Sequence, residues 1–357
     1  MIRNALILAV ASSLPPCAAR AQNSVTLYGV LDAGITFVSN QGGHSNLIVD
    51  TGEMQANRWG IQGTEDLGGG MKAVFKLESS FSLSNGASSG GLAFSRVAAV
   101  GLSNDYGTIT LGRQYDFMND FLQQYTSGNE FAGAYDRRPL DIDRIGGEDE
   151  NSSIKYVSAN LSGFTLGAMY GFSGAPGQFG GAAGAPRYTS FGLNYAGGPL
   201  SGAIAYANTN GAGGSLAEGV LKATALRNWG AGAQYNFGSL TIYGNYTNSR
   251  ASGALTTVAT AIQVFDGGFV WFVTPAVNLG LGYSFVDWQD ADLNRFNAGV
   301  HYFLSKRTDV YATAILVRSN SSSQPAGIFT VVNPATNTGY SSNRNQLAVR
   351  LAMRTHF

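Results

Sequence analysis

The sequence has little cysteine, little charge and no long hydrophobic run beyond its first residues. Its 357 residues contain one cysteine, Cys17, which excludes a disulfide framework and a site built from several cysteine ligands. Charged residues make up 12% of the chain, about half the usual fraction. After Ala21, no segment contains the roughly 18 consecutive apolar residues of a transmembrane helix.

Motifs for catalysis are also missing. The three histidines, His44, His301 and His356, are far apart in the sequence. There is no His-Glu-x-x-His motif, and Gly280-Leu281-Gly282 lies in a strand pattern rather than before a helix. A hydrolase needs a nucleophile, a base and an orienting group together. We therefore expect neither an enzyme nor a cofactor or metal for catalysis.

The first 21 residues predict a secretory signal peptide. Arg3 precedes an apolar core at residues 5–10, and Ala19-Arg20-Ala21 has the small-x-small pattern of a cleavage site. The core is too short to span a bilayer, which requires about 20 residues. Removing residues 1–21 takes away Cys17 and leaves 20 basic against 22 acidic groups. A net charge near −2 argues against nucleic acid as a partner.

The remaining chain has the alternating pattern of β-strands. Apolar residues recur at every second position in runs of about ten residues, as in 71–81 and 277–285. The chain also contains 48 glycines and 11% aromatic residues. A soluble β-sandwich shows the same alternation, but its strands usually have five or six residues. Runs of ten favour strands that lie between lipid and a water-filled lumen.

The spacers between the runs predict a barrel of 16 strands. Seven short turns alternate with eight longer loops, which include Ser39–Thr51, Tyr115–Glu150, Val286–Ala291 and Ser319–Ser342. An even strand number with short turns at one end is typical of outer-membrane proteins. We therefore predict an all-β fold, a 16-stranded antiparallel transmembrane β-barrel formed by a single domain, residues 22–357. A barrel of this size leaves an aqueous channel.

The segment Tyr115–Glu150 differs from the rest of the chain. It has no clear strand or helix period and contains nine of the 22 acidic residues. Loops longer than about 12–15 residues are usually functional or disordered. We predict that this segment folds into the lumen and narrows it, forming a constriction loop. A solvated surface loop is the alternative.

The alternation also predicts which charged side chains face the lumen. Five cations share the inward parity: Arg58, Lys72, Lys76, Arg96 and Arg350. Four of them, all except Lys72, lie at similar heights near mid-membrane, together with Asp32. Cations in an apolar environment are costly, so these side chains must face water or opposite charge. The same alternation places Arg113 on the outward face of its strand.

Acids of the constriction loop could supply that opposite charge. The candidates are Asp136, Asp141, Asp143 and Glu148. A cationic wall opposite an anionic loop would create a transverse field, and charge rings of this kind set ion preference. The alternative is that the wall cations are ordinary solvated side chains.

Several segments resemble the trimeric general porins of Gram-negative bacteria, especially the beta-proteobacterial branch. They are Asn23–Gly34, Asn57–Glu78, Ser95–Leu102, Tyr106–Gln114, Leu304–Asp309 and the terminal Phe357. The resemblance implies a homotrimer among outer-membrane lipids that lets small hydrophilic solutes and ions diffuse passively. It also implies that Arg58 and Arg96 are wall arginines of the constriction, and that Phe357 is read by the barrel assembly machinery.

One departure concerns the acidic run at residues 148–150. The family often has an arginine just before the Asn-Ser of the next strand, whereas Glu150 precedes Asn151 here. Loss of that arginine would weaken an anion preference. The clustered carboxylates could alternatively bind a divalent cation such as calcium. Two other functions remain open: a substrate-specific channel, and a surface-interaction barrel such as an adhesin or receptor.

Overall fold

The computed structural model describes residues 24–182, 184–211, 216–253, 260–288, 291–321, 326–328 and 340–357. The predicted signal peptide, Met1–Ala21, lies outside the described residues. Within them, no helix combines the length and apolar character needed to cross a membrane.

The described residues contain seventeen strands in one antiparallel sheet. They are β1 (Ser24–Gln41), β2 (His44–Thr51), β3 (Arg58–Gly68), β4 (Met71–Ser80), β5 (Val97–Asn104), β6 (Gly107–Tyr115), β7 (Asp149–Ser158), β8 (Phe164–Gly171), β9 (Arg187–Gly197), β10 (Leu200–Asn210), β11 (Ala225–Asn236), β12 (Leu240–Ser252), β13 (Thr260–Thr274), β14 (Val277–Trp288), β15 (Ala291–Phe303), β16 (Thr308–Ser319) and β17 (Asn345–His356).

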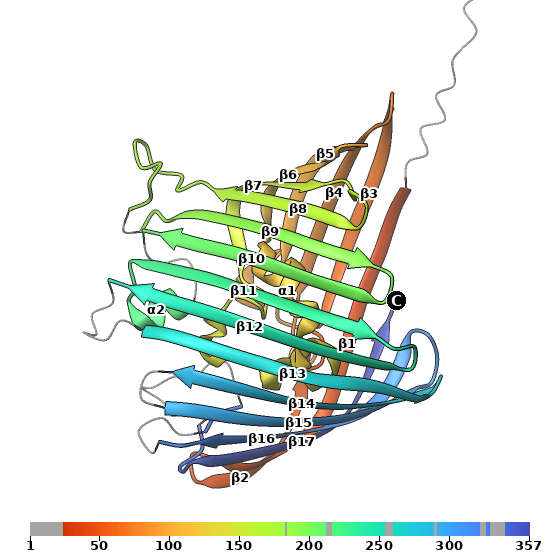
Figure 1. Ribbon diagram of the computed structural model, residues 1–357, viewed down its shortest axis with the longest axis vertical. Helices are drawn as coiled ribbons and strands as arrows, with labels where there is room; N and C mark the ends of the chain where they lie inside the picture. Colours follow the sequence, from red (N-terminus) through yellow and green to blue (C-terminus); the bar gives the residue numbers. More distant parts are fainter. Residues whose placement is uncertain are drawn as a thin grey trace, which may run out of the picture.

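The sheet closes on itself as a barrel of sixteen strands. Strands β2 and β3 pair with the upper and lower parts of β1, so they are two pieces of one barrel strand. The ring closes where residues 30–38 of β1 pair with residues 348–356 of β17. The predicted 16-stranded antiparallel barrel is confirmed (Figure 1). Closure pairs the strand edges, as a lipid environment requires.

The seven short turns lie at the end of the barrel where the chain ends (Figure 1).

Two of the predicted long loops at the other end are wrong. The segment Ser39–Thr51 is a hairpin, because β1 continues to Gln41 and β2 starts at His44 after two glycines with positive φ. Likewise, β14 and β15 extend to Trp288 and from Ala291, which leaves little of the predicted loop Val286–Ala291.

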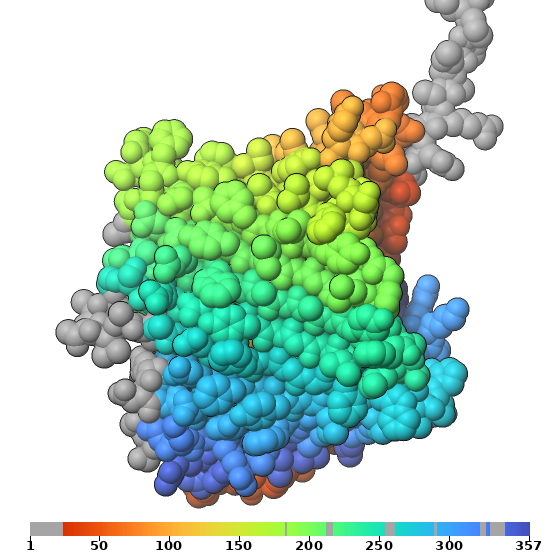
Figure 2. Space-filling model, viewed as in Figure 1, coloured from red at the N-terminus to blue at the C-terminus, as the bar shows by residue number. Residues whose placement is uncertain are grey.

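The alternation of the sequence corresponds to two faces of the barrel wall. Large apolar side chains such as Leu27, Leu102 and Ile204 are exposed on the outside, while Asp32 and Glu78 are buried on the inside. Figure 2 shows the outer face over strands β9 to β15 as a continuous wall. Exposed apolar groups on a closed barrel are stable when they face hydrocarbon.

The segment between β6 and β7 lies inside the barrel, as predicted. It contains the helix α1 (Phe117–Leu122) and four shorter helical turns, η2 (Gln123–Tyr125), η3 (Gly128–Ala132), η4 (Gly133–Asp136) and η5 (Pro139–Asp141). Helix α1 contacts β9, β10 and β11 (Figure 1). Outside the constriction loop, the described residues contain η1 (Ser89–Gly91) and α2 (Leu216–Leu221).

Large side chains of the constriction loop pack onto glycines of the wall. A Cβ atom at Gly167 would lie 2.2 Å from the ring of Phe117, and one at Gly280 would lie 2.3 Å from the ring of Phe131. Such distances exclude any larger residue unless the loop moves. Glycine therefore allows the loop backbone to approach the wall closely at these strand positions.

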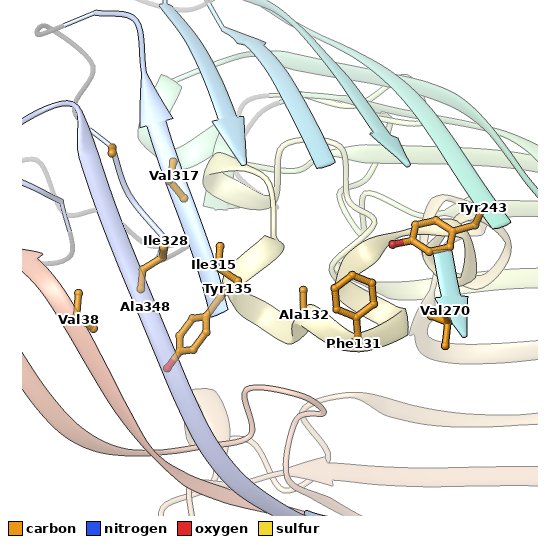
Figure 3. Packing of buried hydrophobic residues seen from close by; sticks show 11 residues of the cluster. Val38, Phe131, Ala132, Tyr135, Tyr243, Val270, Ile315, Val317, Ile328 and Ala348 are labelled. Atoms are coloured by element: carbon orange, nitrogen blue, oxygen red, sulfur yellow. The ribbon is translucent and has the colours of Figure 1, made fainter. Parts of the chain in front are cut away.

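The tip of the loop packs on the opposite side of the barrel. Tyr135 extends toward Ala348 and Val38, whereas Phe131 lies nearer Val270 (Figure 3). All five side chains are buried. The loop therefore crosses the lumen from β6 and β7 to the seam where the barrel closes.

Candidate functional site

An opening remains between the constriction loop and the wall at β3, β4 and Arg96, the residue before β5. This opening, which we call the slot, has a volume of about 230 Å³. Arg58, Lys76, Glu78 and Arg96 line its wall side. The loop supplies several polar groups on the other side, such as Asn119, Gln123, Asn129, Arg137 and Asp141.

Three predicted wall cations meet in the slot, around a carboxylate that the prediction did not include. Arg96 Nε lies 2.6 Å from Glu78, Lys76 Nζ lies 3.4 Å from it, and Arg58 Nε lies 3.9 Å away. The hydroxyl of Tyr28 donates to the same carboxylate at 2.7 Å. Glu78 lies two positions after Lys76 on the same strand, so the two side chains point to the same side. The strand alternation in the sequence therefore already indicated that Glu78 faces the lumen.

Water in the slot meets the cations rather than the carboxylate. The side chains of Arg58 and Arg96 are each 21% exposed and that of Lys76 is 42% exposed, whereas Glu78 is 4% exposed. The guanidinium of Arg96 also lies over the ring of Tyr115, 5.4 Å from its centroid. Glu78 therefore holds the three cations in place from behind.

The loop acids Asp136 and Asp143 do not face these cations. Both are buried beside a loop arginine, Arg138, which lies 3.8 Å from Asp136, 3.2 Å from Asp143 and 3.0 Å from Asp266 of β13. Burial lowers the pKa of Arg138, but the three carboxylates outweigh that effect and raise it above its usual value. These acids anchor the loop to the wall.

Two more buried arginines hold the loop. Arg144 Nε lies 2.7 Å from Asp116, and Arg144 Nη2 lies 2.6 Å from Glu150 at the start of β7. Arg295 of β15 donates to the carbonyl oxygens of Tyr135 and Arg137 at 3.1 and 2.6 Å. Arginine suits this role because its planar guanidinium donates in several directions at once.

The other two predicted loop acids differ in position. Asp141 lines the slot, and its carboxylate accepts from the amide of Gly146 at 2.8 Å. Burial raises the pKa of Asp141 to about 7, although Arg137 opposes the shift. Glu148 is half-buried near the end of the loop, outside the slot lining. In the described part of the chain, the carboxylates at 148–150 are not among any group of three that could hold a metal ion.

Two predicted wall cations lie outside the slot. Arg350 is buried, with its Nη2 2.7 Å from Asp32, and it also pairs with Asp50 of β2. The sequence predicted a cation on the wall of the constriction, because Asp50 was expected in a loop rather than in a strand beside Arg350. Lys72 is exposed next to the short turn at Gly69 and Gly70.

Arg113 also lies outside the slot. It is the extra residue at a register shift in β6, and it donates to the carbonyl of Ser95 at 2.9 Å and to Asn151 at 2.7 Å. Its guanidinium lies 3.1 Å from Asp149. These contacts tie the start of β5 to the start of β7.

A second segment enters the lumen between β2 and β3. Asp32 holds this segment, residues 52–57, because its carboxylate accepts from the amide of Met54 at 3.1 Å and its amide donates to Asn57 at 2.6 Å. Residues 52–56 line one end of the slot. The sequence gives no signal for this feature, since no glycine or proline pattern distinguishes a segment that enters the lumen from an outer loop.

Comparisons with known proteins agree with this architecture. A family model described as Gram-negative porin matches residues 5–322. An outer-membrane porin protein of Bordetella pertussis is 31% identical, over 83% of this chain and 89% of its own length. Outer membrane porin protein 32 of Delftia acidovorans is 28% identical, over 98% of this chain and 99% of its own length.

A solved structure is also similar. The anion-selective porin from Comamonas acidovorans superposes with a TM-score of 0.79 at 25% identity, covering 94% of this chain and all of that one. The barrel, the loop in its lumen and these relatives lead to one conclusion: the chain belongs to the Gram-negative porin family and is an outer-membrane porin, a channel for small hydrophilic solutes.

Proposed function

We propose that the slot is the selective part of the channel and that it favours small anions over cations. Ions must pass close to the charged groups that line a constriction, so those groups set the preference. Five cationic and three acidic side chains line the slot. The constriction therefore carries more positive than negative charge.

The observation that carries this proposal is the difference in exposure around Glu78. Its carboxylate lies behind Arg58, Lys76 and Arg96, so a passing ion meets guanidinium and ammonium groups first. On the loop side, Arg137 is half-buried in the slot lining, while Asp136 and Asp143 are buried elsewhere. A positively lined opening attracts anions and repels cations. The Comamonas relative, described as anion-selective, supports the same sign.

The reversal potential in a planar bilayer under a potassium chloride gradient tests this proposal. We expect stepwise, ohmic conductance with anion preference, and a lower preference in the double variant Arg58→Gln and Arg96→Gln. Lys72→Gln is the matched control, because it removes a lumenal charge outside the slot and should leave the preference nearly unchanged. Cation preference in the wild type, or equal effects of the two changes, would contradict the proposal.

The same measurements separate the rival functions. Flux that saturates with one class of solute would identify a substrate-specific channel, and a folded protein without conductance would favour a surface-interaction barrel. No described group of slot residues matches a catalytic arrangement, and we assign the protein no reaction. Its solutes are therefore expected to pass unchanged.

We further propose a homotrimer, as the family resemblance implies, with lipid against the remaining outer wall. Light scattering of the purified protein tests that assembly. Phe357, whose side chain is 47% exposed at the end of the last strand, is proposed to contact the assembly machinery, and its deletion should lower the amount of barrel in the membrane. N-terminal sequencing of the mature protein tests the proposed domain boundary, because removal of a signal peptide at residues 1–21 would leave Gln22 as the first residue.

A further inference from the structure

Glu53 lies at one end of the slot, on the segment that separates β2 from β3. Its carbonyl accepts from the amide of Ala134 at 2.5 Å. The neighbouring Gly133 has φ +67°, and a Cβ atom there would lie 2.2 Å from the same carbonyl. The loop tip on one side, and the hydrogen bond from the amide of Met54 to Asp32 on the other, fix the backbone at Glu53. Glu53 itself belongs to the slot lining.

The carboxyl of Glu53 is not neutralised by a direct partner. Within the described residues it takes part in no hydrogen bond and no ion pair. The other two acids of the slot are engaged: Glu78 by three cations and Asp141 by the amide of Gly146. A change in the charge of Glu53 would therefore act on the slot without first breaking a contact.

The groups around Glu53 on the wall side disfavour its negative charge. Asp50 of β2 and Asp32 of β1 lie close by, and both are paired with Arg350 of β17. Tyr311 of β16 donates to Asp32 at 2.8 Å. The neighbouring carboxylates are thus already bound to their own partners, and they add like charge beside Glu53.

On the loop side, Arg137 is the cation that acts on Glu53. Arg58 and Lys76 line the same slot from β3 and β4, and Arg138 lines it from the loop. Burial and the charge of Asp50 outweigh Arg137 and raise the pKa of Glu53 to about 8. The carboxyl is then mostly neutral at pH 7 and becomes ionised as the pH rises past 8.

We propose that Glu53 regulates the ion preference of the slot: in its neutral form it adds no negative charge to the lining, and in its ionised form it opposes Arg137 and reduces the preference for anions. This inference rests on the proposed anion preference. It adds a second group that sets the ion preference, and this group is positioned by the segment between β2 and β3 rather than by the constriction loop. The ligand class is unchanged, namely small inorganic or organic anions.

The test is the reversal potential of the full-length porin under a potassium chloride gradient, measured from pH 6 to pH 9.5. The wild type should lose anion preference by about two- to fivefold across pH 7–9, the effect of one charge on an ion at contact distance in water. Glu53→Gln should lose the part of this change that is centred near pH 8, and it should keep a smaller change near pH 7 that comes from Asp141. Glu53→Asp should restore a pH-dependent step, which shows that the titrating group is a carboxyl at this position.

Asp141→Asn is the matched comparison, because burial also raises the pKa of Asp141, to about 7, and Asp141 lines the same slot. This variant should lose only the component near pH 7 and should retain the step near pH 8. Loss of the step near pH 8 in Asp141→Asn, its persistence in Glu53→Gln, or a flat wild-type profile would each overturn the inference. A wild type that prefers cations at pH 6 would instead contradict the proposed function, so the two failures are distinguishable.

Discussion

Arginines occupy two regions of this lumen and behave differently in each. On the slot wall, Arg58 and Arg96 share one carboxylate and remain partly exposed to water. In the constriction loop, Arg138 and Arg144 are buried, and each has two or three carboxylates around it. In the proposed function the first pair presents charge to passing ions, whereas the contacts of the second pair hold the loop against the barrel.

If the proposed ion preference is correct, exposure and the balance of neighbouring charge, rather than residue type, distinguish arginines that act on ions from arginines that hold the fold together. The positive charge of a buried arginine is largely cancelled by the acids around it, so its electrostatic effect on solutes in the lumen is small. Such an arginine is also costly to remove, since its loss leaves uncompensated charges in a region of low dielectric. A partly solvated arginine contributes less to stability and more to the field in the slot.

The largest effect is expected for Arg138→Met. This change leaves Asp136, Asp143 and Asp266 without their common cation, so the free energy of unfolding should fall by about 3–5 kcal/mol. Arg58→Met is the matched control, and it should cost less than about 1 kcal/mol because the side chain is partly solvated. Denaturant unfolding of the protein in lipid vesicles measures both. Equal losses would remove the distinction between the two regions.

An intermediate effect is expected for Gly280→Val. The added side chain would overlap the ring of Phe131, and overpacking of this kind costs about 1–3 kcal/mol. The loop should shift into the lumen, which lowers the single-channel conductance and increases current noise. Gly244→Val is the control, because a Cβ atom there would meet no atom closer than 3.8 Å. If both variants conduct like the wild type, close packing on glycine does not hold the loop.

The smallest effect is expected for Glu78→Gln, which tests whether the wall carboxylate moderates its three cations. The slot gains one net positive charge, so anion preference in the reversal potential should rise by about twofold. Glu65→Gln, on the same hairpin but exposed beside the turn, should not change it. A fall in preference would mean that Glu78 matters mainly because it orients Arg58 and Arg96.

Much of the fold could be predicted because strand alternation and spacer length are local signals. The same alternation placed Arg58, Lys76 and Arg96 on the lumenal face, and the structure brings all three to the slot. The alternation indicates which side of the barrel wall a side chain faces, but it does not indicate which groups surround that side chain. Arg350 has the correct parity and is nevertheless buried, because Asp50 lies on a strand piece that was expected to be a loop.

The charges within the constriction loop were harder to predict. Its nine acids are conspicuous in the sequence, but two of its three arginines, Arg138 and Arg144, determine where several of those acids point. Arg295 of β15 holds the backbone of the loop as well. Such pairings depend on contacts between segments more than 100 residues apart, such as that of Arg138 with Asp266, and no local pattern encodes them.

The contacts at the barrel seam also bear on the order in which the pore is completed. The hydroxyl of Tyr135, at the loop tip, donates to Thr36 of β1 and bonds to Asp50, and Asp50 is paired with Arg350 of the last strand. Until β17 is in place, Asp32 and Asp50 lack their cation and the loop tip lacks its finished docking surface. The slot therefore reaches its final dimensions only when the last strand has paired, so a barrel that lacks β17 also lacks a completed constriction.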